Sequence, residues 1–360
     1  MKSFLCSLML LLIGNSAYPD SDTQIIEIQF EYSVSADVFE IMDNVSGWWQ
    51  GFTKPEYKIF WAEKYGVSKK DDALFETYAH LRSKYYNDPS QSQKDILKNR
   101  NGFFASLESD TVDPIAQAFY TSNSLEESFG KLKVFLSAEE LSFLINFYKN
   151  FESKYKNLIS ESEQEFEVTL DKVRKAFDKK EVKVYFSKVS DFYNVKPHKY
   201  RVLYVWWPPL NRTNASTSAS NIIMRYNPIL HKEIDSSDVI AHEMIHIISN
   251  HQNSKQKKAL THKFLKECPD SISLRTLRIL EEPLAVAFGQ LIFNKKFFPE
   301  RFEYASNLYN SQWINSMARV MYLPLLERFN NGETINDGFI KEAAILCSGL
   351  TASATELLGE

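Results

Sequence analysis

The segment near residue 240 predicts a helix that is apolar on almost every side. Residues 239–248 read Val-Ile-Ala-His-Glu-Met-Ile-His-Ile-Ile, and Asp238 stands where the first turn of a helix favours a carboxylate. A helix that is apolar nearly all round is buried, so the rest of the chain has to enclose it. We therefore predict a core helix at about 235–250 that carries two histidines and a glutamate into the interior.

The two histidines of this segment have the spacing of metal ligands. His242 and His246 are four residues apart, which on a helix separates their side chains by only about 40°. Their imidazoles can then share one Zn²⁺ ion, which binds neutral imidazole and accepts tetrahedral coordination with one open position. Glu243 points to the flank, where a general base would stand. The alternative is a core helix whose histidines bond to carbonyl groups.

A third ligand is expected from a pair of carboxylates further along the chain. Glu281 and Glu282 open an apolar segment, where carboxylates are costly unless a positive charge neutralises them. Glu282 is the preferred ligand, and the small Ala285 three residues later would let two helices approach closely. Glu281 remains the alternative, because Pro283 disfavours helical geometry in the residue before it. Alternatively, the two glutamates only stand at the start of a helix, where carboxylates interact favourably with the helix dipole.

These residues resemble the gluzincin branch of the zincin metallopeptidases. The resemblance rests on His242-Glu243-Met244-Ile245-His246 and on Glu282-Pro283-Leu284-Ala285, and it covers about residues 180–295. It implies that His242, His246 and Glu282 hold zinc and that Glu243 is the catalytic base. It also implies that the strand at 221–226 is the sheet edge that holds extended substrate.

Two positions depart from the family pattern. Pro283 stands where glycine is usual after the third ligand, and Val286 stands where thermolysin-like members carry an aspartate. The chain is therefore not a close relative of thermolysin.

The remaining sequence predicts a predominantly helical α+β fold. Apolar residues at three- and four-residue spacing predict helices at 93–104, 114–129, 138–155 and 163–177. Strand-forming residues predict strands at 182–186, 201–207 and 221–226, with a polar loop at 211–220. Further helices are expected at 274–293, 306–329 and 337–358. We expect a helical N-terminal domain at 18–160, followed at 161–360 by a two-lobed zincin-like unit with a small mixed sheet.

The N-terminus predicts export. Lys2 precedes an apolar stretch at 4–13, and small residues around Ala17 offer a cleavage site, so residues 1–17 form a candidate signal peptide. The mature protein would then be secreted or periplasmic. In that oxidising setting Cys268 and Cys347 form either a disulfide or two buried thiols. No segment is long and apolar enough to predict a stable membrane span.

The sequence favours an exported zinc peptidase over other classes. A net charge of −4 gives no basic surface for nucleic acid. The resemblance to metallopeptidases implies a peptide or protein substrate. Glu243 would remove a proton from a water held by the metal, and Tyr304, Tyr309 and Tyr322 are possible oxyanion donors or simply packing residues. The alternatives are a catalytically silent binding protein with a zincin fold, and an exported helical adhesin or inhibitor acting through residues 20–160.

Overall fold

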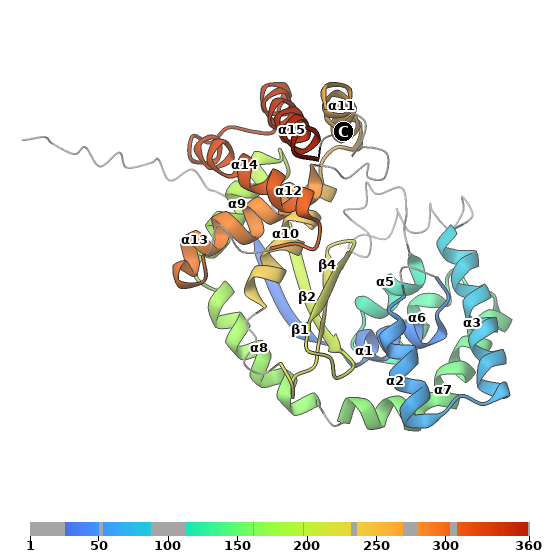
Figure 1. The fold of residues 1–360 in the computed structure, drawn as a ribbon. Helices are drawn as coiled ribbons and strands as arrows, with labels where there is room; N and C mark the ends of the chain where they lie inside the picture. Colours follow the sequence, from blue (N-terminus) through green and yellow to red (C-terminus); the bar gives the residue numbers. More distant parts are fainter. Residues whose placement is uncertain are drawn as a thin grey trace, which may run out of the picture.

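The computed structural model describes residues 26–49, 53–87, 113–160, 162–196, 198–231, 236–268, 280–302 and 308–358. Over these residues the protein is a predominantly helical α+β fold with a small mixed sheet, which confirms the predicted class (Figure 1). The predicted signal peptide at 1–17 and the predicted helix at 93–104 lie outside the described residues.

One sheet of four strands lies at the centre of the molecule, in the order β1-β2-β4-β3 (Figure 1). The strands are β1 (Glu27–Tyr32), β2 (Lys199–Trp206), β3 (Asn214–Ser218) and β4 (Asn221–Tyr226). β1 is parallel to β2, and β2 is parallel to β4, whereas β3 is antiparallel to β4. β2 and β4 are the strands predicted at 201–207 and 221–226.

β3 is one of the two edge strands of the sheet, which corrects two expectations. Residues 211–220 were expected to be a loop, but their middle forms β3 and pairs with β4. β4 consequently lies inside the sheet, so the expectation that 221–226 forms the edge is wrong. Asn and Ala are depleted in strands, and therefore the pairing with β4, rather than local propensity, makes β3 extended.

The strand predicted at 182–186 is also wrong, because these residues lie in helix α9 (Lys180–Phe192). Apolar and polar residues alternate over only these five positions, whereas over the whole of α9 the apolar residues have helical spacing. The buried apolar residues of this helix are Val182, Tyr185, Phe186, Val189 and Phe192. A helical period sustained over three turns outweighs a local alternation of five residues.

A group of helices formed by the N-terminal half lies beside the sheet (Figure 1). They are α1 (Val34–Ser46), α2 (Pro55–Tyr65), α3 (Lys69–Asn87), α5 (Pro114–Tyr120), α6 (Leu125–Leu132) and α7 (Ala138–Ser160), followed by α8 (Glu163–Phe177) along β1. The single helix predicted at 114–129 is two helices, because the Ser124 hydroxyl accepts a hydrogen bond from the Glu127 amide and caps α6.

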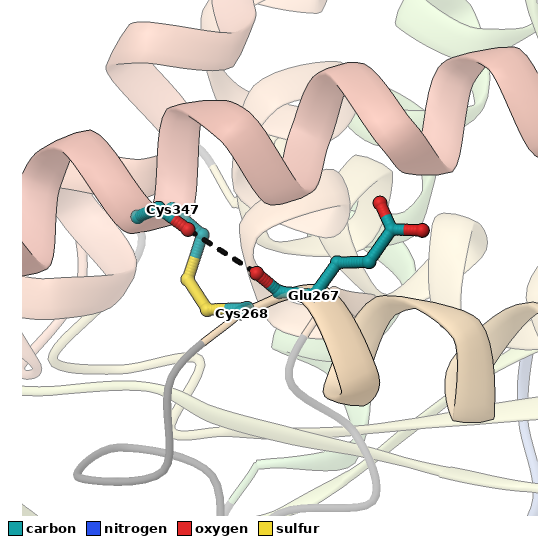
Figure 2. Close-up of a disulfide and its surroundings, with 4 residues drawn as sticks. Glu267, Cys268 and Cys347 are labelled. Atoms are coloured by element: carbon teal, nitrogen blue, oxygen red, sulfur yellow. Dashed lines mark hydrogen bonds between the residues drawn. A yellow bond between two sulfur atoms is a disulfide. The ribbon is translucent and has the colours of Figure 1, made fainter.

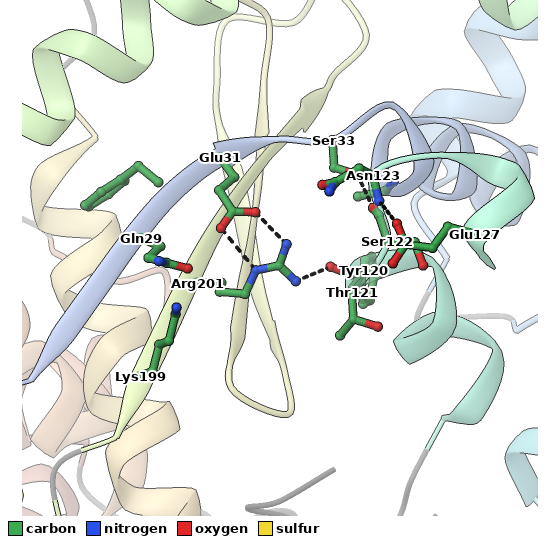
Figure 3. A network of polar contacts seen from close by, with 12 residues as sticks. Gln29, Glu31, Ser33, Tyr120, Thr121, Ser122, Asn123, Glu127, Lys199 and Arg201 are labelled. Atoms are coloured by element: carbon green, nitrogen blue, oxygen red, sulfur yellow. Dashed lines mark hydrogen bonds and ion pairs between the residues drawn. The ribbon is translucent and has the colours of Figure 1, made fainter. Parts of the chain in front are cut away.

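The sheet draws on both of the predicted domains. β1 precedes the division expected at residue 160, and it pairs along its whole length with β2, which follows that division. Arg201 of β2 reinforces this junction: its guanidinium binds the Glu31 carboxylate of β1 and donates to the Tyr120 carbonyl at the end of α5 (Figure 3). The N-terminal helices are thereby fixed to the sheet that faces the histidine helix.

The C-terminal part of the chain is helical and surrounds the predicted core helix. Its elements are α10 (Ser237–Asn250), α11 (Ser254–Glu267), α12 (Glu281–Val286), the π-helix η2 (Ala287–Ile292), α13 (Phe293–Phe297), the 3-10 turn η3 (Pro299–Arg301), α14 (Gln312–Asn330) and α15 (Asp337–Leu358). α10 and α15 occupy the ranges that the sequence predicted. None of the helices in the described ranges has the length and apolarity needed to cross a bilayer.

Cys268 and Cys347 form a disulfide (Figure 2), which resolves the alternative that the sequence left open. The bond joins the end of α11 to α15, across a sequence separation of 79 residues. The Ser348 hydroxyl adds a hydrogen bond of 3.2 Å to the Glu267 carbonyl beside it. The segment that carries Glu281 and Glu282 lies within the loop that this disulfide closes.

Asp37 joins α1 to the sheet through a fully buried carboxylate. Its Oδ1 accepts a hydrogen bond from the Trp206 amide at 2.5 Å, and its Oδ2 accepts one from the Tyr32 hydroxyl at 3.0 Å. Burial raises the pKa of Asp37 from 3.8 to about 7, although both hydrogen bonds oppose the rise.

The raised pKa of Asp37 predicts that the free energy of unfolding falls as the pH rises from about 4 to about 7. In that window the unfolded chain has released the Asp37 proton while the folded chain retains it. The free energy of unfolding should fall by up to about 4 kcal/mol relative to Asp37→Asn, whose amide cannot titrate. Urea unfolding of both proteins without zinc, at pH 4.5 and pH 7.5, measures the difference. Parallel pH profiles would contradict the prediction.

Candidate metal centre

Helix α10 carries the two histidines on a buried face. His242 and His246 are 7% and 8% exposed, and their Nε2 atoms lie 3.0 Å apart. Four residues along an α-helix return to nearly the same side, which brings the two imidazoles together. Asp238 lies in the first turn of α10, where its charge favours the helix dipole. The local sequence is thus sufficient to place two nitrogen atoms side by side.

Glu282 brings an oxygen atom to the same point. Its Oε2 lies 3.5 Å from the Nε2 of His242 and 3.4 Å from the Nε2 of His246. A tetrahedral zinc ion with ligands at about 2.0–2.1 Å keeps its ligand atoms about 3.3 Å from one another. The triangle of 3.0, 3.4 and 3.5 Å therefore has the dimensions of three corners of a zinc tetrahedron. Within the described residues, this is the one group of three or more His, Cys, Asp or Glu side chains whose ligand atoms lie close enough together to hold a metal ion.

The polar atoms of the triangle also fit a cation. Glu282 Oε2 is buried and accepts no hydrogen bond from the described residues, and such an oxygen is costly unless a positive charge faces it. Burial alone would raise the pKa of Glu282, yet the imidazoles of His242 and His246 hold it well below its usual range. Burial opposes protonation of His246, yet Glu281 and Glu282 outweigh it and raise its pKa to about 10. The carboxylates thus make this a place that attracts positive charge.

Glu281 faces the other nitrogen of His246. Its Oε1 lies 3.3 Å from His246 Nδ1, and its Oε2 lies 3.4 Å from the ammonium of Lys257 on α11. Adjacent residues in the first turn of α12 point about 100° apart, so one carboxylate reaches the Nε2 atoms and the other reaches Nδ1. Glu281 therefore stands outside the triangle, in the position from which a carboxylate orients a ligating imidazole.

Gly289 sets the distance between α10, which carries the two histidines, and η2, which continues directly from the helix α12 that carries Glu282. A Cβ atom at this position would lie 2.5 Å from both the Cα and the N of His242. The π-helix η2 thus packs directly on the α10 backbone, and the Tyr185 hydroxyl donates to the Phe288 carbonyl at 2.7 Å. The sequence led us to expect the close approach at Ala285, and it gave no role to Gly289. The available signal was a lone glycine inside an apolar helical run.

Two further side chains lie beside the triangle. Glu243 is half-buried and lines the cleft, next to His242 but outside the group of three. The ring of Tyr309 stacks on His242, with centroids 6.0 Å apart and planes at 23°. Of the other tyrosines considered from the sequence, Tyr322 is buried against Phe302, and Tyr304 lies outside the described residues.

The side chain of Asn315 holds the backbone of Tyr309 in place. Its Oδ1 accepts hydrogen bonds at 3.0 Å from the amides of both Leu308 and Tyr309, and its Nδ2 donates to the Tyr309 carbonyl. Asn315 lies on α14 and is 4% exposed, so it links the loop to the helical core. The position of Tyr309 beside His242 is therefore built into the fold.

The triangle opens into a cleft of about 830 Å³. One wall is the edge strand β3, and the other walls come from α1, α3 and α5 of the N-terminal half and from α10 and α12. The cleft is lined by residues that include Trp48, Lys54, Arg82, Gln117, Ser216, Arg225, Glu243, Gln290 and Tyr309. The residues of β3 and the three residues of the triangle thus line the same cleft.

No protein-family model, curated protein or solved structure matches this chain.

Proposed function

We propose that the protein is an exported zinc-dependent peptidase of the gluzincin type, with His242, His246 and Glu282 as the metal ligands. The observation that carries the proposal is the triangle of two imidazole nitrogens and one carboxylate oxygen, which has the dimensions of zinc coordination. Three protein ligands leave the fourth position open, which is typical of catalytic rather than structural zinc sites.

The presence of Glu243 favours catalysis over a silent binding role. A zinc ion held by the triangle would act as a Lewis acid and lower the pKa of a water molecule toward about 7. Glu243 lies in the cleft beside His242 without entering the triangle, so its carboxylate is available to accept that proton and return it to the leaving amine. A purely structural metal site has no use for a base in this place.

The edge strand and Tyr309 supply the remaining parts of the proposed mechanism. β3 pairs with β4 on one side, and its five residues are half-buried along the cleft. An extended peptide can add to such an edge by main-chain hydrogen bonds, which would fix the register of the substrate. Tyr309, whose ring stacks on His242 and which lines the cleft, is our candidate for the oxyanion donor that such a mechanism requires.

The disulfide supports the proposed secreted or periplasmic location. Cys268 and Cys347 are bonded in the structure, and disulfides persist mainly in oxidising compartments. The proposal thus joins export, a metal site and a peptide-sized cleft in one molecule.

Zinc affinity and zinc-dependent cleavage test the proposal together. We expect the purified protein to bind one zinc ion per chain and to cleave a mixed peptide pool, with cleavage lost on treatment with 1,10-phenanthroline and restored by zinc. Glu282→Gln and His242→Ala should abolish tight binding in a chelator-competition titration, because each removes one of three ligands. Glu281→Gln should weaken the affinity by roughly 10–100-fold, the usual effect of losing a carboxylate that orients a ligand.

Glu267→Gln is the matched control, since Glu267 is exposed at the end of α11 and should leave zinc affinity unchanged. Zinc affinity that is equal in wild type, His242→Ala and Glu282→Gln would reject the site. Tight zinc binding without any zinc-dependent cleavage would favour the silent binding protein instead.

A further inference from the structure

Two closed ion pairs lie near the start of α2, and the first of them lines the cleft. Arg225 Nε binds Glu40 Oε2 at 2.8 Å, and both side chains are buried. The same Glu40 carboxylate also accepts hydrogen bonds from Tyr120 and Asn44. Nearby, Arg212 pairs with Glu56. Each of these carboxylates is therefore already engaged by an arginine.

Lys54 is a further positive charge in this cleft, which is also lined by Arg82, itself paired with Asp43 and Asp113. Lys54 is half-buried, it lines the cleft, and no described carboxylate lies within ion-pair distance of its ammonium group. Burial, reinforced by the charge of Arg225, lowers the pKa of Lys54. The charges of Glu40 and Glu56 oppose this shift, but both carboxylates are already paired with arginines, so the ammonium group has lost part of its hydration without forming an ion pair of its own within the described residues.

The backbone of Lys54 is fixed although its ammonium is unpaired within the described residues. Its amide donates to Asn44 Oδ1 at 2.6 Å, and it is the residue that precedes the first turn of α2. A fixed backbone reduces the entropy lost when the side chain takes up a ligand. Lys54 therefore has the features of a preformed contact for an anion that enters the cleft.

We infer that Lys54 binds a carboxylate of the peptide substrate and so determines which peptides the cleft accepts. This inference rests on the proposed peptidase function, because it takes the occupant of the cleft to be a peptide. Peptides offer carboxylates from two sources, the side chains of Asp and Glu and the C-terminal group. The first source would give an endopeptidase selective for acidic sequences, and the second would give an enzyme that removes short C-terminal fragments.

Binding of three fluorescein-labelled decapeptide pools to zinc-loaded Glu243→Gln protein separates these sources and does not depend on turnover. One pool has free C-termini and lacks Asp and Glu, the second has amidated C-termini and contains Asp and Glu, and the third is amidated and lacks both. We expect the first or the second pool to bind roughly tenfold more tightly than the third, as for a partly desolvated charge-assisted contact. The pool that gains affinity identifies the source.

The added substitution Lys54→Met should abolish this preference and leave the affinity of the neutral pool unchanged. Lys58→Met, one turn further along α2 and exposed, is the matched control and should retain the preference. Equal binding of the three pools, or an equal loss for all of them in Lys54→Met, would overturn the inference. Absence of cleavage by the wild-type enzyme would overturn the proposed function, whereas the binding preference would still decide the role of Lys54.

Discussion

Glu243→Gln is expected to lower kcat by roughly 10²–10⁴-fold while zinc content stays at the wild-type value. The substitution keeps the shape of the side chain and removes its ability to accept a proton. Glu243 is not a member of the triangle formed by His242, His246 and Glu282, so the proposed metal ligands are left intact. Cleavage of a quenched peptide pool and metal analysis of the same preparations measure the two quantities.

Asp238→Asn is the matched control for this prediction. It neutralises a carboxylate on the same helix, five residues before Glu243, and the new amide oxygen can still accept the hydrogen bond of 2.8 Å from the Val239 amide. Its activity should stay within about threefold of the wild type, because Asp238 is not a member of the triangle and its interaction with the helix dipole is modest. If both variants cleave the pool like the wild type, Glu243 is not the base and the catalytic proposal fails.

The parts of the site that depend on one helix could be predicted from the sequence. The spacing of His242 and His246 fixes their geometry as soon as the segment is helical, and its apolar neighbours make a helix in the core the natural result. The carboxylates could be predicted only as a pair. Their division into Glu282 near the Nε2 atoms and Glu281 near Nδ1 depends on the rotation of α12 relative to α10, which is a tertiary property.

The parts of the fold that depend on strand pairing could not be predicted in the same way. β3 has a sequence typical of a loop and becomes a strand because β4 pairs with it. β1 lies before the helical N-terminal half and pairs with a strand that follows it by more than 160 residues. Sequence patterns report local preference, whereas strand partners at this separation are chosen by the complete fold.

Gly289 illustrates the same limit at the metal centre. Its role follows from how closely η2 lies against α10, and nothing in the neighbouring sequence specifies that the facing atoms are the backbone of His242. The triangle joins residues from these two packed segments, since Glu282 is on α12 and η2 continues directly from it. The separation of the segments therefore controls both the stability of the core and the geometry of the triangle.

Gly289→Ala should consequently damage folding and metal binding together. The added methyl group would meet backbone atoms at 2.5 Å, and a helix backbone cannot rotate away as a flexible side chain can, so η2 and α10 have to move apart. Overpacking of this kind typically costs 1–3 kcal/mol, and contact with backbone places this site at or above about 3 kcal/mol. Metal sites tolerate displacements of only about 0.5 Å, so zinc affinity should fall by more than about 100-fold.

Gly130→Ala provides the comparison, because it is also a glycine within a helix, and a Cβ atom there meets nothing within 4 Å. It should leave zinc affinity unchanged and raise the free energy of unfolding by about 0.5–1 kcal/mol, the usual gain of alanine over glycine in a helix. Urea unfolding of the zinc-free proteins and chelator competition for zinc measure the two effects separately. Should the two variants prove equally stable and equally able to hold zinc, the close packing of η2 on α10 would not be what positions Glu282 opposite the histidines.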